Sequence, residues 1–273
     1  TIDAKKHSIA ILQGNINRYM PVGNDYESMV YARYESLLKS LTTKPDLIVW
    51  PSNSFPGVYE KNQTGQEWLK KLITNSGTFH IIGSSVLKNN EYYDSTLFFD
   101  SSGNELNRTF REITIPFYKK TPLWSVSANI SNDRFFSFNS SVFNITTCYE
   151  IMFAHRVRKY ALAGSNFIIN QTDDALALNT AVPRHNIIAC IFRAIENRRF
   201  VLRAAKNSLS AIINHKGKII NILPVFQKGI IEGSTDSLIV KTFYTQYGDV
   251  FAYICLLILF FVIYIFMIKK QKK

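Results

Sequence analysis

The 273-residue chain contains little cysteine, glycine or proline, and each shortage excludes a class of protein. Its three cysteines, Cys148, Cys190 and Cys255, are widely spaced and form no Cys-x-x-Cys pair, so they provide neither a disulfide framework nor a zinc site. Twelve glycines and eight prolines are too few for collagen-like or low-complexity sequence. The histidines show no metal-ligand spacing, and we therefore expect neither a metal nor a cofactor.

Positive charge is in excess but is not concentrated on one segment of the main domain. The chain carries 32 Lys and Arg against 20 Asp and Glu, a net charge of +12. Lysines at positions 269, 270, 272 and 273 lie together at the C-terminus, and the rest of the excess is scattered. A nucleic-acid-binding surface clusters its Lys and Arg on one face, so we expect no nucleic-acid partner.

One hydrophobic run is long enough to cross a bilayer. Residues 251–268 read FAYICLLILFFVIYIFMI, without a charge, a glycine or a proline. At ~1.5 Å rise per residue this run reaches about 27 Å as a helix, close to the thickness of the hydrocarbon layer. The Lys-rich tail that follows predicts a cytoplasmic C-terminus, with the preceding domain on the opposite side of the membrane.

The first residues, TIDAKK, contain neither an initiator methionine nor an apolar signal region. A domain outside the cytoplasm needs an export signal. We therefore expect either a signal that was removed or membrane segments that precede this chain.

Apolar strands alternate with amphipathic helices early in the chain, and hairpins appear between them, which predicts an α/β fold with mixed strand directions. The expected helices cover residues 26–41, 67–76 and 186–199. The expected strands cover residues 7–12, 47–50, 79–84, 95–100, 142–147, 166–170, 210–214, 218–223 and 237–242. In the last helix, Ile187, Ile188, Ile191, Phe192 and Ile195 are expected to form one apolar face.

These elements predict one globular domain at residues 1–247, a transmembrane helix at residues 248–268 and a basic cytoplasmic tail at residues 269–273. Within the domain, Cys148 follows an expected strand, where strand ends in α/β folds open into a ligand crevice. If the strand continues, alternation places Glu150 beside the thiol. Residue propensity alone favours a buried cysteine without a function.

Six blocks in this order resemble the apolipoprotein N-acyltransferase family of the nitrilase, or carbon-nitrogen hydrolase, superfamily. They are 13–16 (QGNI), 47–51 (LIVWP), 115–117 (IPF), 148–150 (CYE), 193–198 (RAIENR) and 247–249 (YGD). The resemblance runs from about residue 8 to the membrane run. It implies a nitrilase-type α-β-β-α sandwich followed by one C-terminal transmembrane helix. It also implies an upstream bundle of membrane helices, in a bacterial inner (cytoplasmic) membrane, with the globular domain on the periplasmic side.

The resemblance further implies acyl transfer from a phospholipid, through a cysteine thioester, to the N-terminal amine of a lipoprotein. In that family a Cys thiolate is the nucleophile, a Glu is the general base and a Lys stabilises the tetrahedral oxyanion. Cys148 matches the nucleophile. Tyr149 and Glu150 match supporting positions of the family's site.

The remaining family positions are substituted. Ser52 stands where the family has its catalytic Glu, Arg111 where it has its Lys, and Lys119 where it has a further Glu. The family's Asn-x-x-Trp-Phe-Gly loop reads NQTDDA at residues 170–175. Serine cannot accept a proton near pH 7, and arginine keeps its charge but cannot give up a proton.

Three hypotheses follow. The first is a membrane-anchored member of the lipoprotein N-acyltransferase family in which acyl transfer is weak or lost. The second is a pseudoenzyme that binds lipid, lipoprotein or another membrane protein. The third is an active acyltransferase in which Glu150 or Glu112 replaces the missing base.

Overall fold

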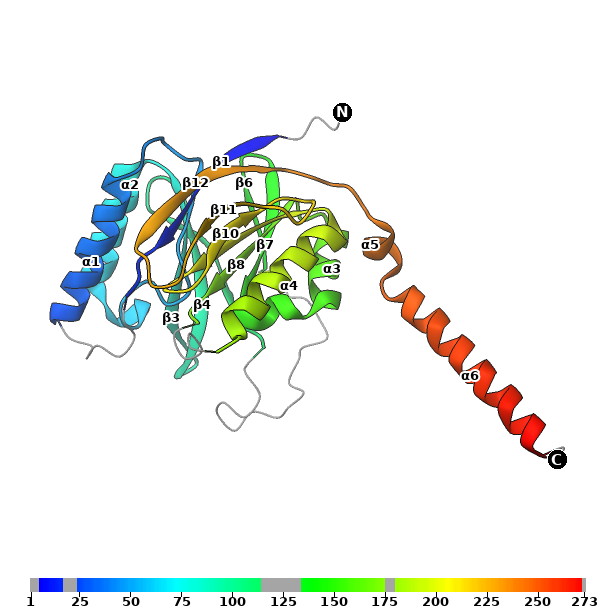
Figure 1. Ribbon diagram of the computed structural model, residues 1–273. Coiled ribbons are helices and arrows are strands. Elements are labelled where there is room, and N and C mark those ends of the chain that lie inside the picture. Colours follow the sequence, from blue (N-terminus) through cyan, green and yellow to red (C-terminus); the bar gives the residue numbers. More distant parts are fainter. Residues whose placement is uncertain (1–4, 17–23, 114–133, 175–179, 272–273) are drawn as a thin grey trace.

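Two six-stranded sheets pack face to face between layers of helices (Figure 1). The computed structural model describes residues 5–16, 24–113, 134–174 and 180–271. Across the first sheet the order is β12 (Gly229–Asp236), β1 (Lys6–Gln13), β2 (Leu47–Val49), β3 (Phe79–Lys88), β4 (Glu91–Phe99) and β5 (Glu105–Phe110). Across the second it is β11 (Ile219–Leu223), β10 (Ser210–Ile213), β9 (Phe200–Ala205), β8 (Phe167–Thr172), β7 (Ser141–Thr147) and β6 (Phe135–Phe138).

Each sheet has three parallel central strands, β1–β2–β3 and β7–β8–β9, and its outer pairs are antiparallel. Helices α1 (Asn24–Lys39) and α2 (Gln63–Ser76) cover the first sheet, and α3 (Ala154–Leu162) and α4 (Val182–Asn197) cover the second (Figure 1). Three apolar clusters fill the layers, one between the sheets and one under each helix pair. The expected α-β-β-α sandwich is therefore confirmed.

Helix α2 begins four residues before its expected start because its first turn is capped. Asn62 accepts a hydrogen bond from the backbone N–H of Gly65 at 2.7 Å, which satisfies a donor that the first helical turn leaves unpaired. The helix ends at Gly77, whose φ of 58° is the left-handed conformation that glycine adopts easily.

The last strand is β12. The prediction of a strand at residues 237–242 is wrong, because these residues form no strand. β12 pairs with β1 in antiparallel register over its whole length, from Gly229 opposite Gln13 to Asp236 opposite Lys6. Its two glycines and its charged and hydroxyl residues hide the strand pattern in the sequence. Just after it, Leu238 is buried in the core but lies in a segment without regular structure.

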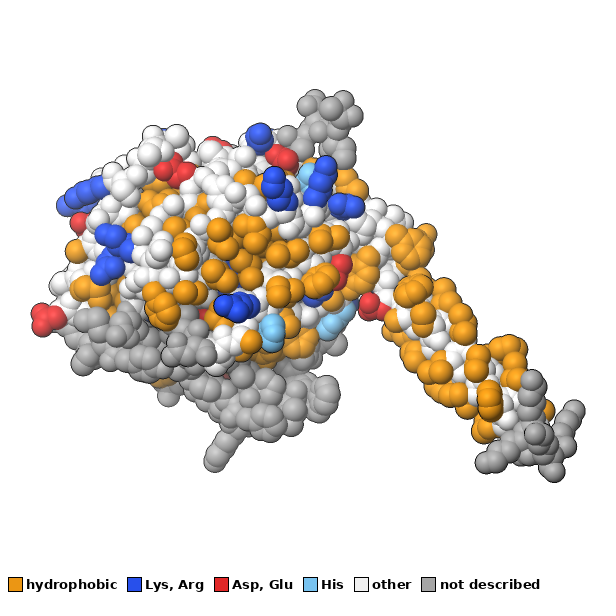
Figure 2. Space-filling view, in the orientation of Figure 1, with side chains coloured by type: hydrophobic (Ala, Val, Ile, Leu, Met, Phe, Trp, Pro, Cys, Tyr) orange, Lys and Arg blue, Asp and Glu red, His pale blue; other side chains and the backbone are white. Residues whose placement is uncertain are grey.

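Helix α4 buries a different face from the one expected. Ile187 is buried, but Ile188, Phe192 and Ile195 are 46%, 54% and 40% exposed. The buried face instead carries small and polar residues, including Cys190 and Ala194. Figure 2 shows hydrophobic side chains gathered over this helix and along α6 (Val250–Gln271). The periodicity of the sequence therefore identified the helix but not the side that packs on the sheet.

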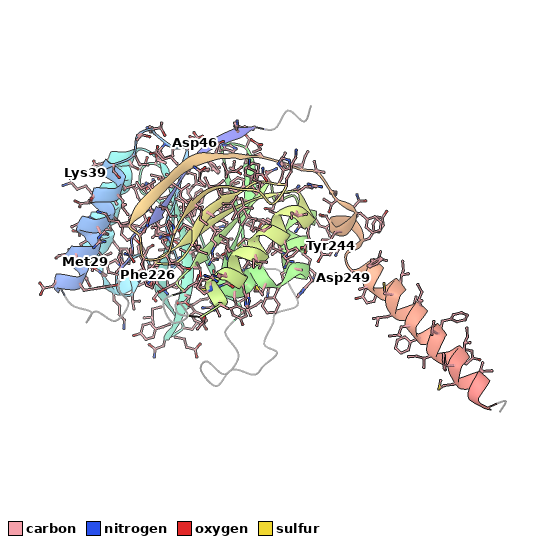
Figure 3. All side chains as sticks on the ribbon, viewed as in Figure 1. Met29, Lys39, Asp46, Phe226, Tyr244 and Asp249 are labelled. Carbon is pink, nitrogen blue, oxygen red and sulfur yellow. The ribbon has the colours of Figure 1, made fainter. Side chains whose placement is uncertain are left out.

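A short helix, α5 (Phe243–Tyr247), joins the domain to α6. Arg158 of α3 donates hydrogen bonds to the backbone oxygens of Tyr244 and Gln246, at 2.9 and 2.7 Å, and so fastens α5 to the domain. Tyr244 and Asp249 mark this junction in Figure 3. Beyond it, α6 extends away from the domain, and its segment Val250–Ile268 has a mean hydropathy of 2.9 with no part buried (Figure 1).

Candidate active site

Cys148 lies at a sharp turn, because β7 ends at Thr147 and a 3-10 helix, η3 (Cys148–Met152), begins at once. The backbone of Cys148 has a φ of 51°, a conformation that costs energy in a residue with a side chain. Asn170 of β8 stabilises the turn by donating a hydrogen bond from Nδ2 to the Cys148 carbonyl at 3.0 Å. The thiol is half-buried at the end of the parallel strands. Its expected position at a strand end is observed.

Glu150 does not lie beside the thiol as a base, because the strand does not continue through it. Its buried carboxylate closes a capping box with Thr147, accepting from the Thr147 N–H at 2.9 Å. It also accepts from the backbone N–H groups of Glu112 and Ile113 at 2.9 and 3.0 Å. The Arg134 guanidinium approaches it at 2.8 Å. All these partners hold Glu150 as a structural carboxylate, and the expected alternation is wrong at this position.

Glu112, the other carboxylate considered as a base, is bound by two arginines. Its Oε1 lies 3.1 Å from Nε of Arg134, and its Oε2 pairs with the guanidinium of Arg156. Both arginine side chains are almost fully buried. Glu112 and Glu150 thus belong to one buried ionic cluster, in which both carboxylates are occupied by arginine side chains and backbone N–H groups.

Arg111 is the cation that faces the thiol. Its Nε donates to the Ile113 carbonyl at 2.9 Å and its Nη1 donates to Oδ2 of Asp94 at 3.0 Å. Its Nη2 is buried and has no hydrogen-bond acceptor within the described part of the chain. Burial lowers the pKa of Arg111, but the facing Cys148 and Asp94 outweigh it, so the pKa lies above its ordinary value. The N–H groups of Nη2 therefore remain available at the site.

The electrostatics around the thiol do not generate a stable thiolate. Burial raises the pKa of Cys148 above its ordinary value, while the charge of Arg111 and the backbone N–H of Asp173 act in the opposite direction without offsetting it. The negative charges of Asp174 and Asp94 add to the rise. At neutral pH the sulfur is therefore mostly a thiol, which is a weak nucleophile.

Ser52 lies in a tight turn after β2, on the opposite sheet from Cys148. Its side chain is buried, and the next residue, Asn53, has a φ of 50°. The turn packs directly on Gly83 of β3, where a Cβ would lie 2.4 Å from the Pro51 carbonyl oxygen and from the Ser52 Cα. Arg111 donates its hydrogen bonds elsewhere, to Ile113 and Asp94. Ser52 therefore shapes the site without supplying a charge to it.

Tyr149 lies against the same cation. The centre of its ring is 5.7 Å from Cζ of Arg111, within cation–π range, and its ring also packs against Phe153 at 5.7 Å. Burial raises the pKa of Tyr149. Lys119, like block 115–117, lies outside the described residues.

Sequence reasoning missed three charged residues of this region. Asp94 pairs with Arg111, as described above. The almost fully buried Lys206 donates from Nζ to the Asn53 carbonyl at 2.8 Å and lies 3.9 Å from Oδ2 of Asp173. Lys206 thus connects the Ser52 turn to the loop that touches the thiol. Asp94, Lys206 and Asp173 come from distant parts of the sequence and meet only through strand register and long-range contacts. No local motif therefore predicts that they lie together.

No cluster suited to a metal is present in the described residues, where no group of three or more His, Cys, Asp or Glu side chains converges. The site consists of a half-buried thiol at a strained turn, a guanidinium whose Nη2 has no described acceptor, and carboxylates held by arginines. This arrangement suits attack of a thiol on a carbonyl carbon, with a fixed cation to receive the developing oxyanion.

Comparisons with known proteins agree with this arrangement. The carbon-nitrogen hydrolase family matches residues 8–243. An apolipoprotein N-acyltransferase of Geobacter metallireducens is 27% identical over 266 residues, which cover 90% of this chain and 51% of that protein. The chain spans about half the length of the curated relatives it matches. The resemblance to apolipoprotein N-acyltransferases is therefore confirmed.

Solved structures share the fold at low sequence identity. An amidase from Nesterenkonia sp. superposes with a TM-score of 0.64 at 16% identity, covering 88% of this chain and 92% of the amidase. Nit3 of Saccharomyces cerevisiae, a nitrilase-superfamily protein, gives 0.65 at 16% identity, covering 85% of this chain and 90% of Nit3. The sandwich is thus of the nitrilase type, and the chain belongs to the carbon-nitrogen hydrolase family.

Proposed function

We propose that this chain is a membrane-anchored protein of the apolipoprotein N-acyltransferase type, in which Cys148 takes an acyl group from a phospholipid slowly. The observation that carries the proposal is the pairing of a half-buried thiol at a strained turn with a guanidinium whose Nη2 has no acceptor among the described residues. A protein that used this fold only as a scaffold would have no need for either feature.

In the proposed step, the Cys148 sulfur attacks the carbonyl carbon of the phospholipid ester, and the thiol proton passes to water. The carbonyl oxygen becomes an oxyanion, and Nη2 of Arg111 donates to it. The ester C–O bond then breaks, the lysophospholipid oxygen takes a proton from water, and a thioester remains on Cys148. The N-terminal amine of a lipoprotein attacks this thioester, the C–S bond breaks and the thiol is restored.

The proposed activity is low because the carboxylate that serves the family as general base is replaced by Ser52, and the carboxylates described near the thiol are paired with cations. Ser52 stands where the family has its base, and the carboxylates of Glu150 and Glu112 are held by Arg134 and Arg156. Loss of a general base costs about 10²- to 10⁴-fold in rate. The pairing of Glu150 and Glu112 with arginines disfavours the hypothesis that either glutamate replaces the missing general base.

We also propose that α6 anchors the domain in a bacterial inner membrane, with the domain on the periplasmic side. The length and composition of Val250–Ile268 support a membrane span, and the lysines after it support a cytoplasmic end. The exposed surface of the helix supports a lipid environment, because no described residue of the domain covers it. Extraction of membranes with alkaline carbonate should leave the full chain in the pellet, and a chain that ends at residue 248 should be released.

The acyl-transfer proposal is tested by incubating the full chain in detergent micelles with a phospholipid that carries a labelled acyl chain. We expect a slowly formed label on Cys148 that hydroxylamine removes and that Cys148→Ala abolishes. A matched Cys190→Ala variant should label normally, since that buried cysteine packs in the apolar cluster between α4 and the second sheet. Absence of any hydroxylamine-sensitive label over hours would contradict the proposal.

A second candidate, a pseudoenzyme that binds lipid or lipoprotein, is favoured by the neutral Ser52 and by the raised pKa of the Cys148 thiol. The same incubation separates the two. Lipid that co-purifies equally with the unchanged chain and with Cys148→Ala, without a thioester in either, supports the pseudoenzyme.

A further inference from the structure

A row of polar residues runs across the first sheet from the Ser52 turn to Arg111. In the register of the sheet, Ser85 of β3 lies opposite Asp94 of β4. Arg111, directly after β5, donates its backbone N–H to the Asp94 carbonyl at 2.8 Å. The row therefore places Asp94 between the turn that has lost its acidic side chain and the cation that faces the thiol.

Asp94 contacts both of its neighbours in this row. Its Oδ2 accepts from Nη1 of Arg111 at 3.0 Å, and its Oδ1 lies 3.4 Å from Nδ2 of Asn53. Asn53 is held on its other sides, since Ser85 donates to its side-chain oxygen at 3.3 Å and Lys206 donates to its carbonyl at 2.8 Å. Asp94 therefore rests on a fixed turn rather than on a mobile surface chain.

The hydrogen bonds of Arg111 leave its guanidinium one orientation. Nε is bound to Ile113 and Nη1 to Asp94, so Nη2 is the remaining edge of the planar group. Removal of the Asp94 contact would leave the guanidinium held only by the Nε hydrogen bond to Ile113, and the planar group could then pivot about that single bond. The side chain of Arg111 is only 13% exposed, which makes the orientation matter more than it would in water.

We propose that Asp94 is a positioning residue of the active site: its carboxylate, supplied from β4, holds the Arg111 guanidinium so that Nη2 faces Cys148, and it is the acidic partner of this cation in place of a residue at position 52. The role of Asp94 in catalysis rests on the proposed function, whereas its effect on the reactivity of the Cys148 thiol does not depend on that function. Asp94 makes no contact with the sulfur and acts through Arg111.

Two effects of Asp94 on the thiol have opposite signs, and this makes the role measurable. As a nearby negative charge, Asp94 raises the pKa of Cys148. As the anchor of Arg111, it keeps in place the charge that lowers the same pKa. The other charged groups that face the sulfur, Asp173 and Asp174, follow β8 and are held by Lys206 and Arg203, so they stay constant when Asp94 is changed.

The experiment measures the rate of Cys148 alkylation by iodoacetamide against pH, on the full chain in detergent, with the Cys148→Ala signal subtracted. Asp94→Asn keeps an oxygen for Nη1 but loses the charge, and we expect it to alkylate at least as fast as the unchanged chain at pH 7. Asp94→Ala loses both, and we expect about threefold to tenfold slower alkylation, because a pKa rise of up to one unit lowers the thiolate fraction by up to tenfold. Asp94→Ser, too short to reach Nη1, should follow Asp94→Ala.

A double variant tests whether Asp94 acts on Cys148 through Arg111. Asp94→Ala combined with Arg111→Met should alkylate no more slowly than Arg111→Met alone, since Asp94 then has nothing to position. Glu91→Gln, an exposed carboxylate on the same strand, is the matched control and should alkylate normally. Unfolding temperatures of all variants establish that each is folded, and Asp94→Asn keeps the shape of the side chain.

Faster alkylation in Asp94→Ala would overturn the proposal, since it would mean that Asp94 acts only as a charge. Unchanged alkylation, or additive losses in the double variant, would overturn it as well. Because alkylation needs no lipid, a chain that follows the expected pattern but forms no thioester contradicts the proposed function and not the role of Asp94.

Discussion

The carboxylate of Glu150 lies 2.8 Å from Nη1 of Arg134, and both side chains are almost fully shielded from water, with 2% and 1% exposed. This pair lies two residues beyond the nucleophile and fixes the turn that carries it. Arg134 also binds Glu112, so one buried guanidinium joins η3 to the residues that follow β5. The position of Cys148 therefore depends on a carboxylate that takes no part in its chemistry.

Glu150→Gln should destabilise the domain by about 3 kcal/mol, because it removes the more deeply buried of the two carboxylates that pair with the buried charge of Arg134 and leaves only Glu112. Denaturant unfolding monitored by tryptophan fluorescence measures the loss. The matched control is Glu196→Gln, which breaks an ion pair with Arg193 in which the carboxylate side chain is 23% exposed. That change should cost less than about 1 kcal/mol. Equal costs for the two variants would contradict the structural role assigned to Glu150.

Local sequence predicted the parts of the fold that depend on local pattern. The apolar strand before Cys148, the hairpin around residues 215–217 and the membrane run all lie where periodicity and turn residues placed them. β12 was missed because two glycines interrupt its pattern, and it forms only where β1 supplies the partner. The apolar face expected on α4 is largely exposed, because periodicity marks an apolar face without showing which face meets the sheet.

In the candidate site, too, the features that depend on local sequence were predictable and those that depend on long-range contacts were not. Cys148 stands at the end of a recognisable strand, so its position followed from the sequence and the family resemblance. Asp94 meets Asn53 across 41 positions, and Lys206 meets the same residue across 153. Such contacts depend on sheet order and register, which composition and spacing do not specify. The role expected for Glu150 failed for a local reason, because a capping box turned the chain before alternation could continue.

Acid should weaken the fold through His80. Trp50 donates to its Nδ1 at 3.0 Å, and its Nε2 lies 2.9 Å from the hydroxyl of Ser76, which matches a neutral ring with the proton on Nε2. Burial lowers the pKa of His80 from 6.5 to about 3. The folded state thus binds fewer protons than the unfolded state between these values, so stability is full above pH 6.5 and falls by about 1.4 kcal/mol per pH unit below it.

Denaturant unfolding of the full chain between pH 7 and pH 4.5 checks this slope. His80→Gln offers an oxygen to Trp50 and an N–H to Ser76 without titrating, and it should flatten the pH dependence even if it lowers stability overall. His155→Gln changes an exposed histidine and should leave the slope as it is. A slope unchanged in His80→Gln would assign the acid sensitivity to other groups.

Arg111→Met should slow thioester formation by about 10²-fold, because it removes the donor proposed for the oxyanion. Single-turnover labelling with the acyl-labelled phospholipid measures the rate. Arg108→Met is the matched control, since Arg108 lies on β5, three residues before Arg111, and pairs with Glu105 and Glu60. Loss of labelling in both variants to the same degree would mean that the strand, and not the guanidinium of Arg111, is what matters.

Ser52→Glu should raise the rate of thioester formation, because it returns a carboxylate to the position at which the family that the chain resembles has its general base. The gain should be about tenfold or more, at the lower end of what a general base contributes, since the new side chain enters a turn packed tightly on Gly83. Ser52→Gln has the same size without the charge and should give no gain. The rate in Ser52→Glu should also rise as the carboxylate ionises, giving a pH dependence below pH 7 that the unchanged chain lacks. A gain shared by Ser52→Gln, or no gain in Ser52→Glu with the domain intact, would mean that the missing charge at position 52 is not what limits Cys148.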